Sequence, residues 1–150
     1  AFKQQLSASK HLVYFGDNAG EIVFDKLLIE TIIESYSPEI VFVVRSVPTL
    51  NDATLRDARS IGLDKIALVI ENGIDGPLPG TILKRSSNEV NDLVRRSDLI
   101  ISKGGGNFDT LDEEREDLQK KISFLLLSKC EPYYRHFGVE IHQPIIANYY

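Results

Sequence analysis

The chain has 150 residues, of which 43% are hydrophobic and 26% are charged, a composition typical of one globular domain with a full core. Its net charge of −5, with no block of Lys and Arg, argues against broad electrostatic binding to nucleic acid. The longest apolar runs, such as 122–127, are far too short to cross a bilayer. Cys130 is the only cysteine, which excludes an intrachain disulfide and a cysteine-based zinc site and favours a reducing, cytoplasmic location.

Short apolar, β-branched runs alternate with helical patterns along the chain. The runs predict strands at 12–15, 40–44, 66–70, 99–102, 122–127 and near 141–147. Between them, helices are predicted at 21–35, 51–61, 87–96, 108–119 and, as a short segment, near 131–137. The alternation indicates a three-layer α/β/α sandwich, a Rossmann-like, doubly wound and mostly parallel sheet with helices on both faces. The continuous apolar strands fit burial on both sides.

Local signals mark several of the element ends. Ser87 is expected to cap the helix that it opens. Gly62 and Gly138 follow helical segments, where a left-handed residue is expected. The Gly-, Pro- and Asn-rich stretch 71–81 is expected to form a loop at the rim of the sheet. The polar residues 1–10, which do not begin with Met, are consistent with the end of a helix entering from a longer protein.

Polar residues follow the carboxyl end of each predicted parallel strand. They include Asp17, Asn18, Arg45, Ser46, Asp52, Glu71, Asn72, Lys103, Gly104, Asn107 and Lys129. Because all carboxyl ends of parallel strands face one edge of the sheet, the topology should gather these residues there. Carboxylate and amide oxygens suit divalent metals, whereas Lys and Arg suit phosphate oxygens. The set therefore predicts a site for a cation and a phosphate.

Each of these residues also has a simpler, structural interpretation. Asp17 and Asn18 are good caps for the first helix, and Asp52 is a good cap for the second. A single Arg45 or Lys103 is more commonly a solvated strand-end charge. The glycine run 104–106 lacks the G-x-G-x-x-G spacing of a dinucleotide site and reads as a turn when taken alone. It is the joint occurrence at several strand ends that favours function.

Three segments, in the right order, resemble the DUF89 family of damage-control, ARMT1-like phosphatases, with the short archaeal-type branch as the nearest match. They are Gly-Asp-Asn-Ala-Gly-Glu at 16–21, Ser-Val-Pro-Thr-Leu-Asn-Asp-Ala-Thr at 46–54 and Ser-Lys-Gly-Gly-Gly-Asn-Phe at 102–108. Leu-Ser-Lys-Cys at 127–130 is similar to a late Lys-Cys segment of that family. The resemblance implies a metal-dependent phosphatase of sugar phosphates or damaged phosphometabolites. It also implies Mn²⁺, Co²⁺ or Ni²⁺ as cofactor, with Mg²⁺ as a further candidate.

The resemblance assigns roles to individual residues. Asp17, Asn18 and Asp52 match the metal ligands of the family, and Lys103 matches a phosphate ligand. The full predicted phosphate-binding set is Arg45, Ser46, Lys103, Gly104, Asn107 and Lys129. Gly105 departs from the pattern, because a Gln is expected there in near relatives. Family members carry a helical region ahead of the first motif, so 1–150 is expected to be the α/β catalytic core of a longer protein.

Two chemical routes and two other classes of function stay open at this level. Either an activated water attacks the phosphoryl group, or one of the Asp residues forms a phospho-aspartyl intermediate. The alternatives are a transferase that binds S-adenosylmethionine or a nucleotide at the first strand–helix turn, and a non-catalytic binding core. The expected partner is a small phosphorylated metabolite, with no nucleic acid and no membrane, and the sequence does not set the oligomeric state.

Overall fold

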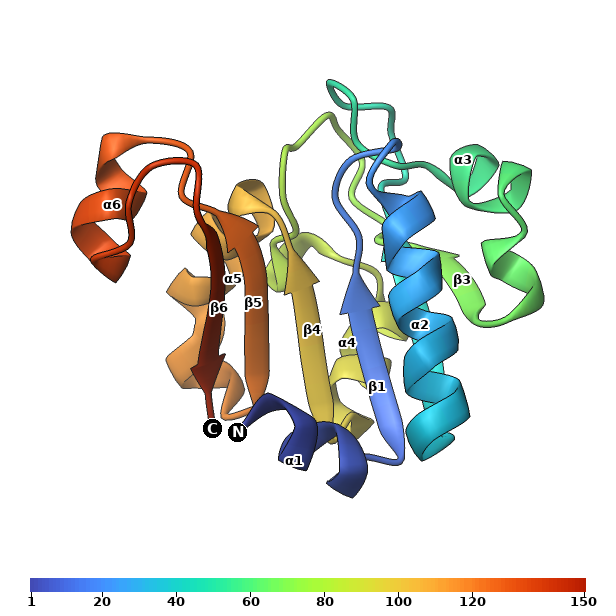
Figure 1. Ribbon diagram of the computed structural model, residues 1–150. Coiled ribbons are helices and arrows are strands. Elements are labelled where there is room, and N and C mark those ends of the chain that lie inside the picture. Colours follow the sequence, from blue (N-terminus) through green and yellow to red (C-terminus); the bar gives the residue numbers. More distant parts are fainter.

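A single six-stranded sheet organises the chain, and the computed structural model describes all 150 residues. The strands are β1 (His11–Phe15), β2 (Glu39–Val44), β3 (Leu68–Glu71), β4 (Leu99–Lys103), β5 (Ile122–Leu127) and β6 (Pro144–Tyr149). Their order is β3-β2-β1-β4-β5-β6; the first five are parallel and β6 is antiparallel to β5 (Figure 1). This confirms the predicted doubly wound, mostly parallel sheet.

Helices cover both faces of the sheet, and each face has its own core. The helices are α1 (Phe2–Ala8), α2 (Ile22–Tyr36), α3 (Leu55–Ser60), α4 (Asn88–Arg96), α5 (Gly105–Leu118) and α6 (Glu131–Phe137). In Figure 1, α2 lies in front of the sheet, and α4 and α5 lie behind it. One core joins α1, α2 and α3 to alternate residues of β1, β2 and β4, and the other joins α4, α5 and α6 to the opposite set. No helix is both long and apolar enough to cross a membrane.

Four predicted boundaries were wrong, and one of them is the last strand, which was expected near 141–147 and is Pro144–Tyr149. The second helix begins at Leu55 rather than at residue 51, because residues 51–54 pair with neighbouring loops instead. The strand expected at 66–70 is Leu68–Glu71, since a 3₁₀ turn at Leu63–Lys65 precedes it. The helix expected from Phe108 starts at Gly105, so the glycine run is the beginning of α5 and not merely a turn.

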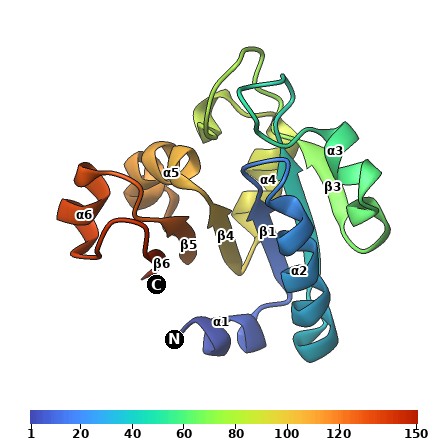
Figure 2. The ribbon, with the colours of Figure 1, turned by 45° about the horizontal axis from the view of Figure 1, so that its top comes forward.

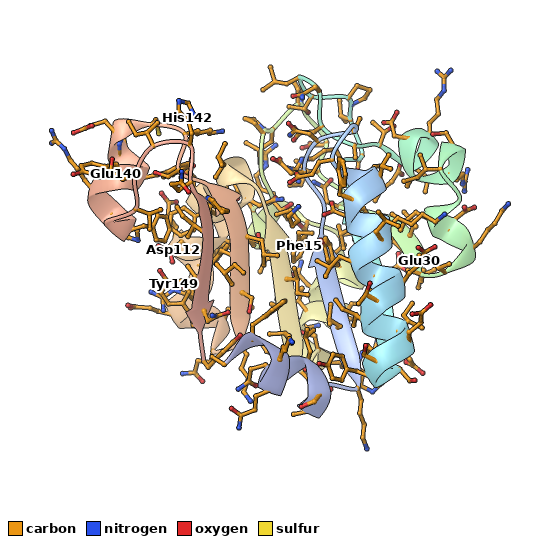
Figure 3. The ribbon with its side chains drawn as sticks, viewed as in Figure 1. Phe15, Glu30, Asp112, Glu140, His142 and Tyr149 are labelled. Atoms are coloured by element: carbon orange, nitrogen blue, oxygen red, sulfur yellow. The ribbon has the colours of Figure 1, made fainter.

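The carboxyl ends of β1, β2 and β4 meet at one edge of the sheet, the upper edge in Figure 1. Figure 2 shows the loops that follow β1 and β2 side by side at this edge. Phe15, the last residue of β1, is fully buried and lies in the interior just below these loops, whereas Glu30 lies on the helix α2 (Figure 3). The chain termini lie at the opposite edge.

We expect the Ser87 cap of α4 to contribute measurably to stability. Its side chain accepts a hydrogen bond from the backbone N–H of Val90, at 3.2 Å, which confirms the predicted cap. Ser87→Ala should lower the free energy of unfolding by about 1 kcal/mol, because it leaves that N–H unpaired. Urea unfolding measures this change. Ser7→Ala, at an exposed position within α1, is the matched control and should be nearly neutral; equal losses in both variants would contradict the capping role.

Candidate active site

The loops after β1 and β2 are joined by backbone hydrogen bonds. Asn18 and Asp52 form an isolated antiparallel bridge. The N–H of Ala53 donates to the carbonyl of Asp17 at 2.7 Å, and the N–H of Ala19 donates to the carbonyl of Asn51 at 2.8 Å. This pairing sets the two predicted metal-ligand segments side by side, although 33 residues separate Asn18 from Asn51.

The capping interpretation of the acidic residues was wrong. Glu21 is the N-cap of α2, and no side chain accepts a capping hydrogen bond there. Thr54 caps α3 in a reciprocal capping box with Asp57, so Asp52 has no part in it. The carboxylates of Asp17 and Asp52 are thus free of the helix ends and available to a ligand.

Arg45 lies between these two carboxylates. Its Nε donates to Oδ2 of Asp52 at 2.7 Å, and its Nη2 is 3.5 Å from Oδ1 of Asp17. Nη1 donates to the side chains of Thr81 and Asn107, both at 3.0 Å. The side chain is only 3% exposed, yet Nη2 has no hydrogen-bond partner. A buried guanidinium with one unused nitrogen beside the acidic pair is suited to receive an anionic oxygen.

The acidic pair is short of positive charge. Burial, followed by the charge of the neighbouring Asp52 carboxylate, raises the pKa of Asp17 to about 6, and Arg45 offsets this rise only in part. The wider cluster holds four carboxylates, those of Asp17, Glu21, Asp25 and Asp52, against the two partly or fully buried cations Arg45 and Lys103. With all six ionised, the deficit is two charges, which a divalent cation would neutralise.

The donor set suits a hard divalent metal only if Asn18 takes part. No three His, Cys, Asp or Glu side chains come together as a metal cluster. Oδ1 of Asn18 accepts a hydrogen bond from Asn51 at 3.0 Å and keeps a second lone pair. Two carboxylates and one amide oxygen therefore fit a Mg²⁺- or Mn²⁺-like ion that takes its remaining ligands from water or phosphate.

Lys103 is held by Glu21, the last residue of the 16–21 motif, and by Asp25, which no sequence motif marked. Its Nζ contacts Oε1 of Glu21 at 2.6 Å and Oδ1 of Asp25 at 2.7 Å. Tyr14 donates its hydroxyl to the same Asp25 oxygen at 2.7 Å. Burial opposes the charge of Lys103, but Asp25 and Glu21 outweigh it and raise the pKa of Lys103 above its ordinary value. The ammonium therefore stays charged at the mouth of the site.

The turn from β4 into α5 brings backbone against the acidic loop. Gly104 has φ +78°, and a Cβ built on it would lie 1.9 Å from Oδ2 of Asp17. Only glycine fits here, because it alone combines this backbone angle with the close approach. Gly105 and Gly106 open α5, so no preceding turn accepts from their N–H groups. At Gly105, where a Gln was expected, the hydroxyl of Tyr133 lies 2.4 Å from the position of a Cβ.

Three further residues of the predicted phosphate-binding set, Asn107, Ser46 and Lys129, have different surroundings. Both N–H groups of the Asn107 amide donate to backbone carbonyls, of Gly16 and Lys103, so none remains for a phosphate oxygen. The Ser46 hydroxyl donates to Asn72 and accepts from the N–H of Gly73. Lys129 is exposed at the rim. The Asn107 side chain therefore braces Arg45, and a contact between this residue and phosphate stays a prediction.

A cleft of about 690 Å³ opens beside these groups. One part is polar and includes Asp17, Asn18, Glu21, Lys103, Gly104 and Lys129. The other part is apolar and includes Phe24, Leu127, Pro144 and Ile146. The cleft is thus large enough for a small molecule, with its charged groups gathered at the carboxyl edge of the sheet.

Comparisons with known proteins identify relatives of the chain. Residues 1–144 match the family model of the damage-control phosphatase ARMT1-like domain. The chain is 42% identical over 137 residues to the uncharacterized protein MJ0202 of Methanocaldococcus jannaschii, covering 91% of this chain and 44% of that protein. It is 36% identical over 136 residues to the damage-control phosphatase PH1575 of Pyrococcus horikoshii, covering 91% and 46%, respectively. It is 38% identical over 138 residues to a damage-control phosphatase of Archaeoglobus fulgidus, covering 92% and 46%.

The fold matches that of a solved structure that is also similar in sequence. The crystal structure of a DUF89 family protein from Pyrococcus horikoshii superposes with a TM-score of 0.86 at 34% identity, covering 97% of this chain and 49% of that one. The chain spans about half the length of these relatives. By the extent of the family match and the agreement of fold, the chain belongs to the family of damage-control phosphatase ARMT1-like (DUF89) proteins.

Proposed function

We propose that the chain carries the catalytic site of a metal-dependent phosphatase that hydrolyses phosphomonoesters of small metabolites. The observation that carries the proposal is that an acidic pair and a buried guanidinium lie together at one edge of the sheet. Asp17 and Asp52 call for a cation, and the unused Nη2 of Arg45 lies 3.5 Å from Asp17 and calls for an anion. A phosphate group bound together with a divalent metal meets both demands.

Asp17, Asn18 and Asp52 are the proposed metal ligands. A cation held there would act as a Lewis acid toward the phosphoryl group. Mn²⁺, Co²⁺, Ni²⁺ and Mg²⁺ are all compatible with these oxygen donors. Sugar phosphates and damaged phosphometabolites are the proposed substrate class, supported by the relatives named damage-control phosphatases.

The protein's own groups have distinct tasks in this proposal. The Lys103 ammonium and the free nitrogen of Arg45 neutralise charge that develops on the phosphoryl oxygens. The unpaired N–H groups at the start of α5 bind the same oxygens, since a helix N-terminus attracts anions. The exposed Lys129 at the rim attracts the phosphate to the cleft.

Hydrolysis of p-nitrophenyl phosphate tests the proposal. We expect no turnover by EDTA-treated protein, and recovery of turnover when Mn²⁺, Co²⁺, Ni²⁺ or Mg²⁺ is added back, because the acidic pair lacks its counter-charge without metal. A panel of phosphorylated sugars then compares kcat/KM among substrates. Activity that survives complete chelation would contradict metal dependence. Binding of S-adenosylmethionine by calorimetry, with no phosphatase activity under any metal, would favour the transferase alternative.

A further inference from the structure

The helix α2 carries one charged residue where its pattern calls for an apolar one. Ile22, Asp25, Ile29 and Ile32 recur at helical spacing and are its buried positions. Asp25 is 1% exposed. A carboxylate in such a place is expensive, because desolvating it costs several kcal/mol unless its partners compensate fully.

The partners of Asp25 do not compensate fully. Both Lys103 and Tyr14 donate to Oδ1, at 2.7 Å each. The second oxygen, Oδ2, is buried and has no hydrogen-bond partner. A buried ion pair with one orphaned oxygen contributes little to stability compared with apolar residues of the same size. The presence of the Asp25 carboxylate on this helix face is therefore better explained by function than by stability.

The groups around Asp25 are rigid, whereas Lys103 by itself is not. Tyr14 is fully buried on β1 and stacks on Phe42 with ring centroids 5.2 Å apart. Asp25 is anchored on a helix whose neighbouring turns pack into the same core. Lys103 has a flexible four-carbon stem, and its other partner, Glu21, has a side chain that is 38% exposed. Tyr14 and Asp25 thus form the rigid part of the surroundings of the Lys103 ammonium. Glu21 is the more exposed partner of the same ammonium.

We infer that Asp25, oriented by Tyr14, is a positioning residue that holds the Lys103 ammonium at the phosphate end of the cleft. The inference rests on the proposed phosphatase function, in which Lys103 contacts the substrate. Asp25 lies behind Lys103 and acts only through it. An anchored ammonium stabilises the transition state without first losing the freedom of its stem.

Kinetics of Asp25→Asn with p-nitrophenyl phosphate and saturating Mn²⁺ test the inference. We expect kcat to fall about 10- to 100-fold, as for loss of groups that orient a ligand. KM should stay within about threefold, because the lost interaction is one made in the transition state. Tyr14→Phe removes only a hydroxyl and should lower kcat by a smaller factor with the fold intact. Thermal unfolding checks each variant.

A double-mutant cycle separates positioning from mere structure. In a Lys103→Met background, Asp25→Asn and Tyr14→Phe should each change kcat by less than about twofold, because their effect passes through Lys103. The matched control is Glu114→Gln, which alters a buried carboxylate that accepts the N–H groups of Leu83 and Lys84 in another part of the fold. It should lower stability and leave kcat unchanged.

The outcomes distinguish the inference from the function on which it rests. A wild-type protein without metal-stimulated activity overturns the proposed function and the inference together. An active wild type with an equally active Asp25→Asn variant overturns the inference alone. So does an Asp25→Asn loss that recurs in full in the Lys103→Met background. Should Asp25→Asn fail to fold, the Tyr14→Phe pair decides in the same way.

Discussion

Replacing Asp17 by Asn should lower the metal-dependent phosphatase kcat by about 10²- to 10³-fold, the usual cost of losing one group that stabilises transition-state charge. The same change should raise the Mn²⁺ concentration required for half-maximal activity. Asn keeps the size of the side chain and one oxygen, so the loss isolates the negative charge. Initial rates of p-nitrophenyl phosphate hydrolysis across a Mn²⁺ titration measure both effects.

Stability should move in the opposite direction from activity. In the metal-free protein, Asp17 is a largely buried carboxylate whose side chain is 17% exposed and which faces Asp52. Asp17→Asn removes that repulsion, so the midpoint of thermal unfolding should stay the same or rise. The matched control, Asp98→Asn, affects a carboxylate that accepts the N–H groups of Lys10 and His11 at the other end of β1. It should lose stability and keep activity.

This contrast is what identifies a functional carboxylate. If Asp17→Asn lost stability as Asp98→Asn does, while kcat and the Mn²⁺ requirement stayed at wild-type values, Asp17 would be a structural residue and the metal site would lie elsewhere. A general collapse of the fold cannot mimic the expected result, because it would lower the unfolding midpoint. The pair of measurements therefore tests the charge deficit of the site directly.

Much of this site was predictable because parallel topology needs little information to specify it. The alternation of apolar runs and helical patterns places Asp17, Asn18, Asp52 and Lys103 at one edge of the sheet. That reasoning uses only the carboxyl ends of strands and no detail of side chains. It succeeded in gathering these residues for the same reason that it succeeded in predicting a mostly parallel sheet.

Loop pairing and side-chain contacts were beyond the same reasoning. Residues 51–54 carry good helix-cap chemistry, but backbone hydrogen bonds to the Asp17 loop hold them extended. Such pairing between loops has no period in the sequence. The inward turn of Arg45 likewise depends on Thr81 and Asn107, which lie 36 and 62 residues away along the chain.

Asp25 is different, because a signal for it was present. It occupies an apolar position of α2 between Ile22 and Ile29, and a charged residue at such a position predicts a buried ionic partner. What the pattern could not supply is the identity of that partner. Lys103 is 78 residues away in sequence, and only the adjacency of β1 and β4 brings it to Asp25.

Gly104→Ala should be as damaging as loss of the Asp17 charge, although it removes no chemical group. A Cβ at this position would lie 1.9 Å from Oδ2 and 2.2 Å from Cγ of Asp17, so the carboxylate must move away. Displacing a metal ligand and the start of α5 together should cost about 10²-fold or more in kcat. Rates measured over a Mn²⁺ titration should also show that a higher Mn²⁺ concentration is required for half-maximal activity.

Gly138→Ala is the control for a positive φ without a clash. Gly138 has φ +65°, close to the +78° of Gly104, but nothing lies within 4 Å of the Cβ that would be added. Gly138→Ala should lose about 1 kcal/mol of stability for placing Ala in the left-handed helical region, and Gly104→Ala should lose more, because its ψ of 164° lies in a region that is almost exclusive to glycine. Only Gly104→Ala should lose activity, because only its methyl group meets Asp17. Equal activity of the two variants would show that the Asp17 carboxylate can move without harm, and the precise placement of that carboxylate would then have no part in catalysis.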